Sequence, residues 1–138
     1  MRWGIGGIAG MLTIALLVSP LMAVEKDKTS VDVRKTAEPM LDNILAGMQF
    51  DDFQRYVRDF DPALTVLGFR SQFFEANRKI KAAYGDYVSR EYLGTLRRGN
   101  GYVVLWKGRF SGTSEHILIK LELVQKNKKY GVTGMWLE

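Results

Sequence analysis

The sequence contains no cysteine, a single histidine and only three prolines. Because cysteine is absent, the chain forms no disulfide, offers no thiol nucleophile and carries no lipid on an N-terminal cysteine. Metal binding is disfavoured as well, since His116 stands alone beside an expected turn and no carboxylates fall at a recognised ligand spacing. We therefore expect no metal, no cofactor and no thiol chemistry.

Several sequence motifs of catalysis and of nucleotide binding are also missing. No serine stands in a G-x-S-x-G elbow, and the glycines at positions 4, 6 and 7 belong to an apolar N-terminal segment, not to a phosphate loop. The chain lacks the interleaved aromatic and basic motif of nucleic-acid-binding modules, so we expect no nucleic-acid partner. A hydrophobic content of 46% and a charged content of 25% are those of an ordinary globular protein.

The N-terminal segment has the layout of a secretory signal. Arg2 precedes an apolar run over residues 5–18, and a Ser-Pro break is followed by a plausible cleavage site after Ala23. We therefore predict that residues 1–23 are a signal peptide and that the protein is exported to the periplasm or the extracellular space. An uncleaved membrane anchor is the alternative, because Trp3 to Val24 is nearly long enough to span a bilayer.

Removal of the signal leaves about 115 residues, enough for one domain with one core. Residues 24–34, which include a polar run, are predicted to be a linker or the start of the first helix. Residues 35–138 are predicted to form a single α+β domain.

The last third of the chain carries the clearest structural signal. Large apolar residues recur at every second position in three runs, Tyr102 to Phe110, Ile117 to Leu123 and Tyr130 to Trp136, and a further strand leads in from Tyr87. Period two in β-branched and aromatic residues, interrupted by polar turns, predicts a four-stranded antiparallel meander with one buried face.

Turn lengths predict the register of this sheet. A loop over residues 111–114 places Trp106 opposite Ile119. A loop over residues 126–129 pairs Gln125 with Tyr130 and places Trp136 opposite Ile119 from the other side. Both loops keep the apolar sets on one face.

The lead-in strand adds a third ring to that face. If Leu96 pairs with Tyr102 across a loop over residues 97–101, Tyr92 falls opposite Trp106. Large rings at this position either line an apolar pocket between sheet and helices or simply fill the core. The pocket-lining candidates are Tyr92, Trp106 and Trp136.

Helical periodicity precedes the sheet. Pro39 suits the first turn of a helix, and an apolar stripe follows it. The alternative is that residues 30–38 add an earlier turn or two. Asp51-Asp52 then caps a short helix, and Asp61 before Pro62 begins another segment in the same way. The two stripes are Met40, Leu41, Ile44, Leu45 and Met48, and then Phe53, Tyr56, Val57 and Phe60.

The longest helix is expected from about Val66 to Tyr84, with Gly85 well placed to end it. Its apolar stripe consists of Phe69, Phe73, Ala76, Ile80 and Tyr84. Helices followed by an antiparallel meander predict an α+β domain, with the helices packed on one face of a curved sheet.

Several stretches of this sequence resemble small exported bacterial domains with a nuclear-transport-factor-2-like (cystatin-like) fold. The resemblance covers the chain from about Lys35 to Glu138 and implies a cone-shaped domain. It implies little about activity, because that family is uncharacterised and its fold hosts isomerases, dehydratases and plain binding modules. The stretches are Ala37 to Gly47, Asp51-Asp52-Phe53, Asp59-Phe60-Asp61, Gly85 to Tyr92, Gly101 to Val104 and Gly134-Met135-Trp136.

Candidates for catalysis are few. In a cone, Asp59 or Asp61 could act as a general base, with Tyr56 or Tyr92 polarising a carbonyl. The competing interpretation is structural: Asp61 caps a helix, Asp59 satisfies nearby backbone, and the tyrosines complete the core. We favour the structural interpretation, so the catalytic assignment is none.

Basic residues gather in alternate turns of the predicted meander, and alternate turns lie at the same end of a sheet. We name the set Arg97, Arg98, Lys126, Lys128 and Lys129 the basic patch. Two strand spacings are about 10 Å, comparable with the Debye length, so the fields of the two turns add. The patch predicts docking to an anionic envelope surface, lipid or acidic partner. The alternative is that the turns are basic because they are exposed to solvent and their charges protect the edges of the sheet from aggregation.

The function expected from these observations is that of a non-enzymatic, exported binding or interaction module of the bacterial cell envelope. One alternative is a small isomerase- or dehydratase-like enzyme that uses the cone pocket. Another is a homodimeric structural module joined through the outer face of the sheet. Apolar residues expected on that face are Val103, Leu105, Leu118 and Val124.

Overall fold

The computed structural model describes residues 32–138 of the chain. The predicted signal peptide (1–23) and residues 24–31 of the predicted linker lie outside the described residues. Within 32–138, no helix is both long and apolar enough to cross a membrane.

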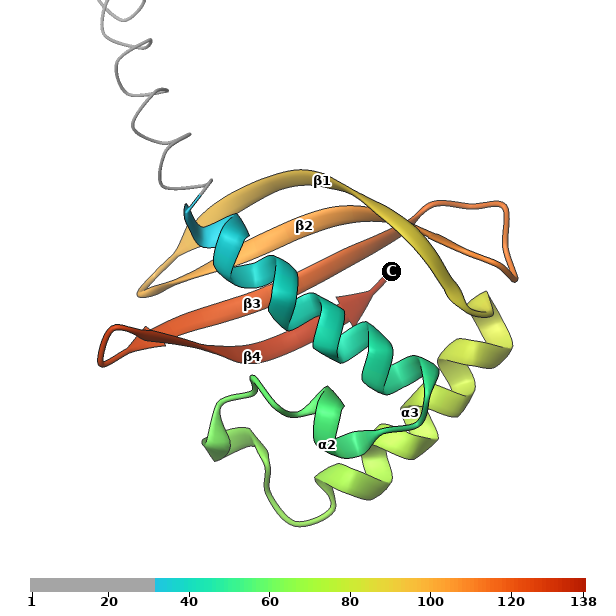
Figure 1. Cartoon of the computed structure of the whole chain (residues 1–138), viewed down its shortest axis with the longest axis horizontal. Coiled ribbons are helices and arrows are strands. Elements are labelled where there is room, and N and C mark those ends of the chain that lie inside the picture. The colour runs from blue at the N-terminus through green and yellow to red at the C-terminus, as the bar shows by residue number, and fades with distance from the viewer. Residues whose placement is uncertain (1–31) are drawn as a thin grey trace, which may run out of the picture. The chain divides into compact units, whose positions relative to one another are not determined.

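Four antiparallel strands form one sheet in the order β1-β2-β3-β4, as the period-two pattern predicts (Figure 1). They are β1 (Tyr87–Arg98), β2 (Gly101–Phe110), β3 (Ile117–Lys126) and β4 (Lys129–Leu137). Alternate residues of β2 and β3 face the core, and Trp106 pairs with Ile119 as predicted. Both side chains are fully buried.

A β-bulge at Thr133 reverses the faces of the sheet to which the side chains at the end of β4 point. Gln125 pairs with Tyr130 as predicted, but the ladder shifts by one residue between Leu123 and Glu122. Trp136 therefore pairs with Lys120 on the outer face, and the prediction that it lies opposite Ile119 is wrong. A one-residue shift is enough, because successive side chains of a strand point to opposite faces.

The two hairpin turns at one end of the sheet are tighter than predicted. The predicted loop over residues 97–101 is wrong: Arg97 pairs with Tyr102, and only Gly99 and Asn100 form the turn. The predicted pairing of Leu96 with Tyr102 is wrong for the same reason. A bulge at Leu93 compensates, so Tyr92 still pairs with Trp106.

The β3–β4 hairpin closes through Asn127 and Lys128, whose φ angles are 52° and 65°. Lys126 and Lys129 pair with each other as strand residues. Two consecutive left-handed residues match the twist of a two-residue hairpin, so the predicted four-residue loop is too long. At the opposite end, the β2–β3 connection covers residues 111–116 and is longer than the predicted 111–114.

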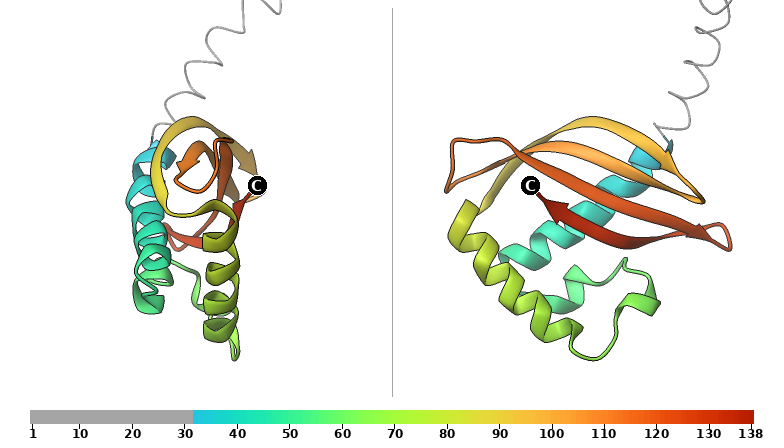
Figure 2. Two further views of the ribbon diagram at one scale, coloured as in Figure 1. Left: turned by 90° about the vertical axis from the view of Figure 1, so that its right-hand side faces the viewer. Right: turned by 180° about the vertical axis from the view of Figure 1, so that it is seen from behind.

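Residues 32–49 form a helix that lies across one face of the sheet (Figures 1 and 2). Pro39 stands inside this helix, so the prediction that it occupies the first turn is wrong, and the alternative of earlier helical turns is confirmed for the described residues 32–38. The Pro39 side chain is exposed, and the ring both removes the hydrogen bond that an N–H at this position would donate and crowds the carbonyl of Lys35. The predicted apolar stripe is confirmed for Leu41, Ile44, Leu45 and Met48, and Val33 and Ala37 extend it.

Two short helices follow, each capped by the predicted aspartate. Asp52 accepts a hydrogen bond from the Arg55 N–H at the start of α2 (Phe53–Tyr56), and Asp61 accepts one from the Ala63 N–H at the start of η2 (Pro62–Leu64). These side chains satisfy N–H groups that a first helical turn leaves without partners.

Helix α3 (Phe69–Tyr84) is shorter than predicted. Gly68, at φ 89°, stands before its first residue, and Val66 and Leu67 lie in the preceding loop. The buried stripe also differs: Asn77 is 2% exposed, whereas Ala76 is exposed.

The chain between α2 and η2 runs beside the free edge of β4. Phe60 forms a parallel bridge with Val132, through hydrogen bonds from the Val132 N–H to the Asp59 carbonyl (2.8 Å) and from the Asp61 N–H to the Val132 carbonyl (2.9 Å). This bridge covers part of an edge that would otherwise be open to pairing. The predicted α+β class, with helices packed against a four-stranded antiparallel sheet, is confirmed.

Candidate functional site

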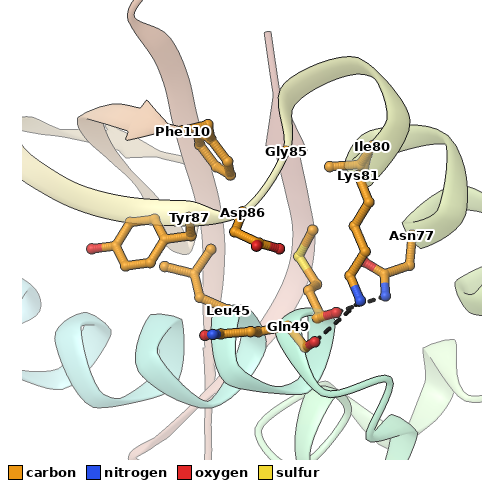
Figure 3. Close-up of a pocket in the computed structure, with 10 residues that line it drawn as sticks. Leu45, Gln49, Asn77, Ile80, Lys81, Gly85, Asp86, Tyr87 and Phe110 are labelled. Carbon is orange, nitrogen blue, oxygen red and sulfur yellow. Dashed lines mark hydrogen bonds between the residues drawn. The ribbon is translucent and has the colours of Figure 1, made fainter. Parts of the chain in front are cut away.

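A small pocket lies between the helix over residues 32–49, α3 and the start of β1 (Figure 3). Its volume is about 20 Å³. That volume accepts about one water molecule, whereas pockets for organic ligands measure some hundreds of cubic ångströms. The pocket is lined by Leu45, Met48, Gln49, Asn77, Ile80, Lys81, Gly85, Asp86, Tyr87 and Phe110.

Polar side chains in this pocket close the end of the helix over residues 32–49. Asn77 Nδ2 donates to the Met48 carbonyl at 2.7 Å, and Lys81 Nζ donates to the Gln49 carbonyl at 3.1 Å (Figure 3). Asn77 Nδ2 also donates to Asp51 Oδ1 at 2.7 Å. The last carbonyls of a helix lack intrahelical partners, so these contacts stabilise its end. Asn77 Oδ1 has no protein partner among the described residues, and a single water fits the space.

The structure does not bring the catalytic candidates Tyr56, Asp59 and Asp61 together as a base and an acid. Tyr56 packs between the rings of Phe60 and Phe73, and burial raises the pKa of its hydroxyl to about 12. Asp59 accepts a hydrogen bond from Asn43 Nδ2 at 2.9 Å.

Asp61 accepts hydrogen bonds from Lys126 Nζ (2.6 Å) and from the Ala63 N–H (3.0 Å). These two bonds hold the pKa of its carboxyl below the ordinary value. A carboxylate stabilised in its charged form is a weak base. Asp61 therefore acts as a helix cap and an ion-pair partner.

The three aromatic candidates for a pocket lining lie in different environments. Trp106 is completely buried, and Tyr92 is half-buried with its hydroxyl 2.7 Å from Thr95 Oγ1. Trp136 is 44% exposed on the outer face, with its ring 5.6 Å from Lys120 Nζ. A Cβ on Gly134 would overlap the Trp136 ring, so glycine there makes room for the indole.

An ion-pair network joins the helix over residues 32–49 to β1, and the sequence analysis did not find it. Arg90 Nε and Nη2 donate to Glu38 Oε1 at 2.9 and 2.8 Å, and Nη2 also donates to Asp42 Oδ1 at 2.7 Å. Arg34 Nε donates to Glu38 Oε2 at 3.1 Å, and its guanidinium lies 4.2 Å from the centre of the Tyr92 ring.

Burial and charge act in opposite directions within this network. Burial acts to raise the pKa of Glu38, but hydrogen bonds from Arg90 and Arg34 and the charge of Arg90 outweigh it, so the net shift is downward. The Trp106 indole N–H adds to this lowering, although Nε1 has no partner within hydrogen-bond geometry. Burial acts to lower the pKa of Arg90, and its bonds to Asp42 and Glu38 reverse the shift. Glu38 and Arg90 therefore both remain charged near neutral pH.

The basic patch lies at one end of the sheet, as the topology predicts. The Asn100 carbonyl in the β1–β2 turn accepts a hydrogen bond from the Gln125 N–H near the end of β3 (3.4 Å), so the two turns are neighbours. Lys126 is paired with Asp61. The other four cations of the patch are exposed, and within residues 32–138 no ion pair links them to a carboxylate. They are Arg97, Arg98, Lys128 and Lys129.

No metal site is found within residues 32–138, where no group of three or more histidine, aspartate or glutamate side chains could hold an ion.

Comparisons with known proteins give no match: no family model fits the sequence, and no curated protein and no solved structure is significantly similar.

Proposed function

We propose that the chain is a binding module exported to the bacterial cell envelope, built as a cystatin-like (nuclear-transport-factor-2-like) cone. It binds through the end of the sheet that carries the two basic turns, and its partner is anionic. The observation that carries this proposal is the grouping of Arg97, Arg98, Lys128 and Lys129 beside a fifth cation, Lys126, that is already paired.

The size of the local charge supports the proposal. The formal charge of the whole chain is +5, and four exposed cations lie on two neighbouring turns. Turns two strand spacings apart are about 10 Å from each other, close to the Debye length at physiological salt, so their fields add. Each cation near an anionic surface contributes about 1 kcal/mol to binding.

The alternative function, that of a small isomerase- or dehydratase-like enzyme, needs a substrate pocket. An isomerase or dehydratase requires a cavity that encloses its substrate, usually some hundreds of cubic ångströms. The pocket beside Asn77 is more than ten times smaller, and Tyr56 and Asp59 hold separate structural contacts. Surface binding is therefore the better-supported function.

Retention on a polyanionic resin tests the proposal. The basic-end variant changes Arg97, Arg98, Lys128 and Lys129 to Gln. The control variant makes four equivalent changes at exposed cations elsewhere, at Lys35, Arg78, Lys79 and Arg109. Both variants have the same net charge, so a difference between them reports the position of the charge.

The basic-end variant should elute at a clearly lower salt concentration than the control variant. Circular dichroism should be unchanged in both variants, since all eight residues are exposed. Equal losses of retention would mean that net charge alone governs binding, and the proposed site would be wrong.

A further inference from the structure

Two bulky aliphatic residues are exposed to solvent at the tip of a protruding loop. Val66 is 64% exposed and Leu67 is 103% exposed, in the loop between η2 and α3. Exposed apolar residues are common when they are scattered singly. Two in succession at a loop tip form a contiguous exposed apolar surface.

Local hydrogen bonds hold this loop in a defined conformation. Thr65 Oγ1 and the Thr65 N–H donate to the Pro62 carbonyl at 2.8 and 3.2 Å, and the Phe69 N–H donates to the Val66 carbonyl at 3.0 Å. Gly68 follows the tip at φ 89°, a left-handed conformation that glycine adopts without strain. The domain therefore presents Val66 and Leu67 on a structured turn.

The base of the loop is fixed to the basic end of the sheet. Asp61, the residue before η2, pairs with Lys126 at 2.6 Å and bonds to the Val132 carbonyl through its N–H. Gly131 packs against Asp61 as well, since a Cβ there would lie 3.5 Å from the Asp61 Cα. In Figure 1 the two basic hairpins lie on the left side of the domain with η2 below them, and the loop continues from η2 to the start of α3 at the bottom of the view; the reverse view in Figure 2 gives the same arrangement.

On the segment that carries the loop, residues 58–74, the charged side chains are two arginines and two aspartates, and both aspartates are engaged. Asp59 accepts a hydrogen bond from Asn43, and Asp61 pairs with Lys126. Arg58 and Arg70 flank the loop and are exposed, and the Arg70 guanidinium stacks 5.3 Å from the centre of the Phe53 ring.

An aliphatic point with basic residues beside it is complementary to an anionic lipid surface. The interface of a bilayer takes apolar side chains to a depth of about 5–10 Å, and its phosphates attract nearby cations. An acidic protein would match the cations, but a convex apolar tip fits a deformable lipid interface better than a rigid surface without a groove. The combination of charge and shape therefore favours lipid.

We propose that this end of the domain docks onto an anionic lipid bilayer, with Val66 and Leu67 inserted among the headgroups. The exposed cations of the basic patch face the lipid phosphates. This inference rests on the proposed function and specifies its partner.

Vesicle co-sedimentation tests the proposal on protein recovered after export. Native protein should bind vesicles of phosphatidylcholine with phosphatidylglycerol, bind vesicles of phosphatidylcholine alone far more weakly, and release as salt rises. The variant V66S/L67S should partition at least about tenfold more weakly, because burial of one aliphatic side chain already corresponds to a factor of about ten.

A matched variant controls for the loss of exposed apolar surface in general. V88S/L93S removes the same side chains from β1, where Val88 and Leu93 are 57% and 52% exposed. It should bind anionic vesicles like the native protein. Equal binding by V66S/L67S and native protein would overturn the insertion of the loop.

A fluorescent reporter tests the position of the loop directly. The emission of Leu67→Trp should shift to shorter wavelength with anionic vesicles, relative to the native tryptophans alone, and quenchers carried on lipid chains should reduce it. Retention on the polyanionic resin without binding to anionic vesicles would overturn the lipid proposal and leave the proposed function standing, with an acidic protein as the partner. Loss of the position-dependent retention would instead contradict the proposed function itself.

Discussion

Arg90 on β1 holds the Glu38 carboxylate on the first described helix through two hydrogen bonds of 2.9 and 2.8 Å, across 52 residues of sequence. The Arg90 side chain is 15% exposed and that of Glu38 is 28% exposed. Hydrogen bonds between oppositely charged, partly buried side chains are screened less by water and salt than ion pairs on the surface. The pair therefore fixes the helix against the edge strand of the sheet.

Replacement of Arg90 by Met should lower the free energy of unfolding by about 2–3 kcal/mol, because it leaves Glu38 half-buried without its main partner. Lys107→Met is the control, since the Lys107–Glu91 pair is 38% and 68% exposed. The control should lose less than about 1 kcal/mol. Urea unfolding measures both changes, and similar losses would contradict a special role for Arg90.

The same pair predicts a pH dependence. The pKa of Glu38 is lower in the folded protein than its ordinary value of 4.5. Its contribution to stability is therefore fully present above about pH 4.5 and is lost as the pH falls through the folded-state pKa. In urea unfolding from pH 7 to pH 3, Glu38→Gln should be less stable than the native protein at pH 7. The difference should shrink below pH 4.5, and a constant difference would contradict the assignment.

The two tryptophans of the sheet should respond differently to truncation. Trp106→Ala removes a completely buried ring and should destabilise the domain by about 3–5 kcal/mol. Trp136→Ala removes a ring that is 44% exposed and should cost about 1 kcal/mol or less. Chemical unfolding followed by far-ultraviolet circular dichroism distinguishes them. Equal losses would mean that the bulge at Thr133 does not turn Trp136 outward.

The outer face of the sheet remains a predicted homodimer surface. Trp136 lies there with Leu105 and Leu118, beside Lys120. Sedimentation equilibrium at micromolar concentration should give a dimer mass for the native protein and a monomer mass for Trp136→Ser. A monomer mass for the native protein would exclude the dimer in that range. This surface is separate from the basic end, so the two predictions stand independently.

Alternating apolar residues were sufficient to predict the sheet. Trp106 and Ile119 were paired correctly because both lie in long runs of period two, where a slip would bury charges. Trp136 was misplaced because the bulge at Thr133 breaks no pattern in the sequence. Asn77 was missed because the predicted apolar stripe took Ala76 as its member at that turn, although Asn77 stands four residues after Phe73.

The charged network was harder to predict, because its members are far apart in the sequence. One feature of the sequence did point to this network. Arg90 stands two residues before Tyr92 on the same strand, so the two side chains point to the same, buried face of the sheet. A buried cation needs an anionic partner, and Glu38 and Asp42 stand one helical turn apart. No ion-pair partner was predicted for Arg90, and whether the residues before Pro39 are helical was left open, so Glu38 was not placed on the same helix face as Asp42.

The most direct test of binding through the basic end is an amide-resolved NMR titration of the native protein with a soluble polyanion. We expect the largest shifts at residues 97–100 and 126–129, and these shifts should decrease as salt is added. Shifts spread evenly over the domain, or concentrated on the outer face around Trp136, would contradict the proposed binding surface.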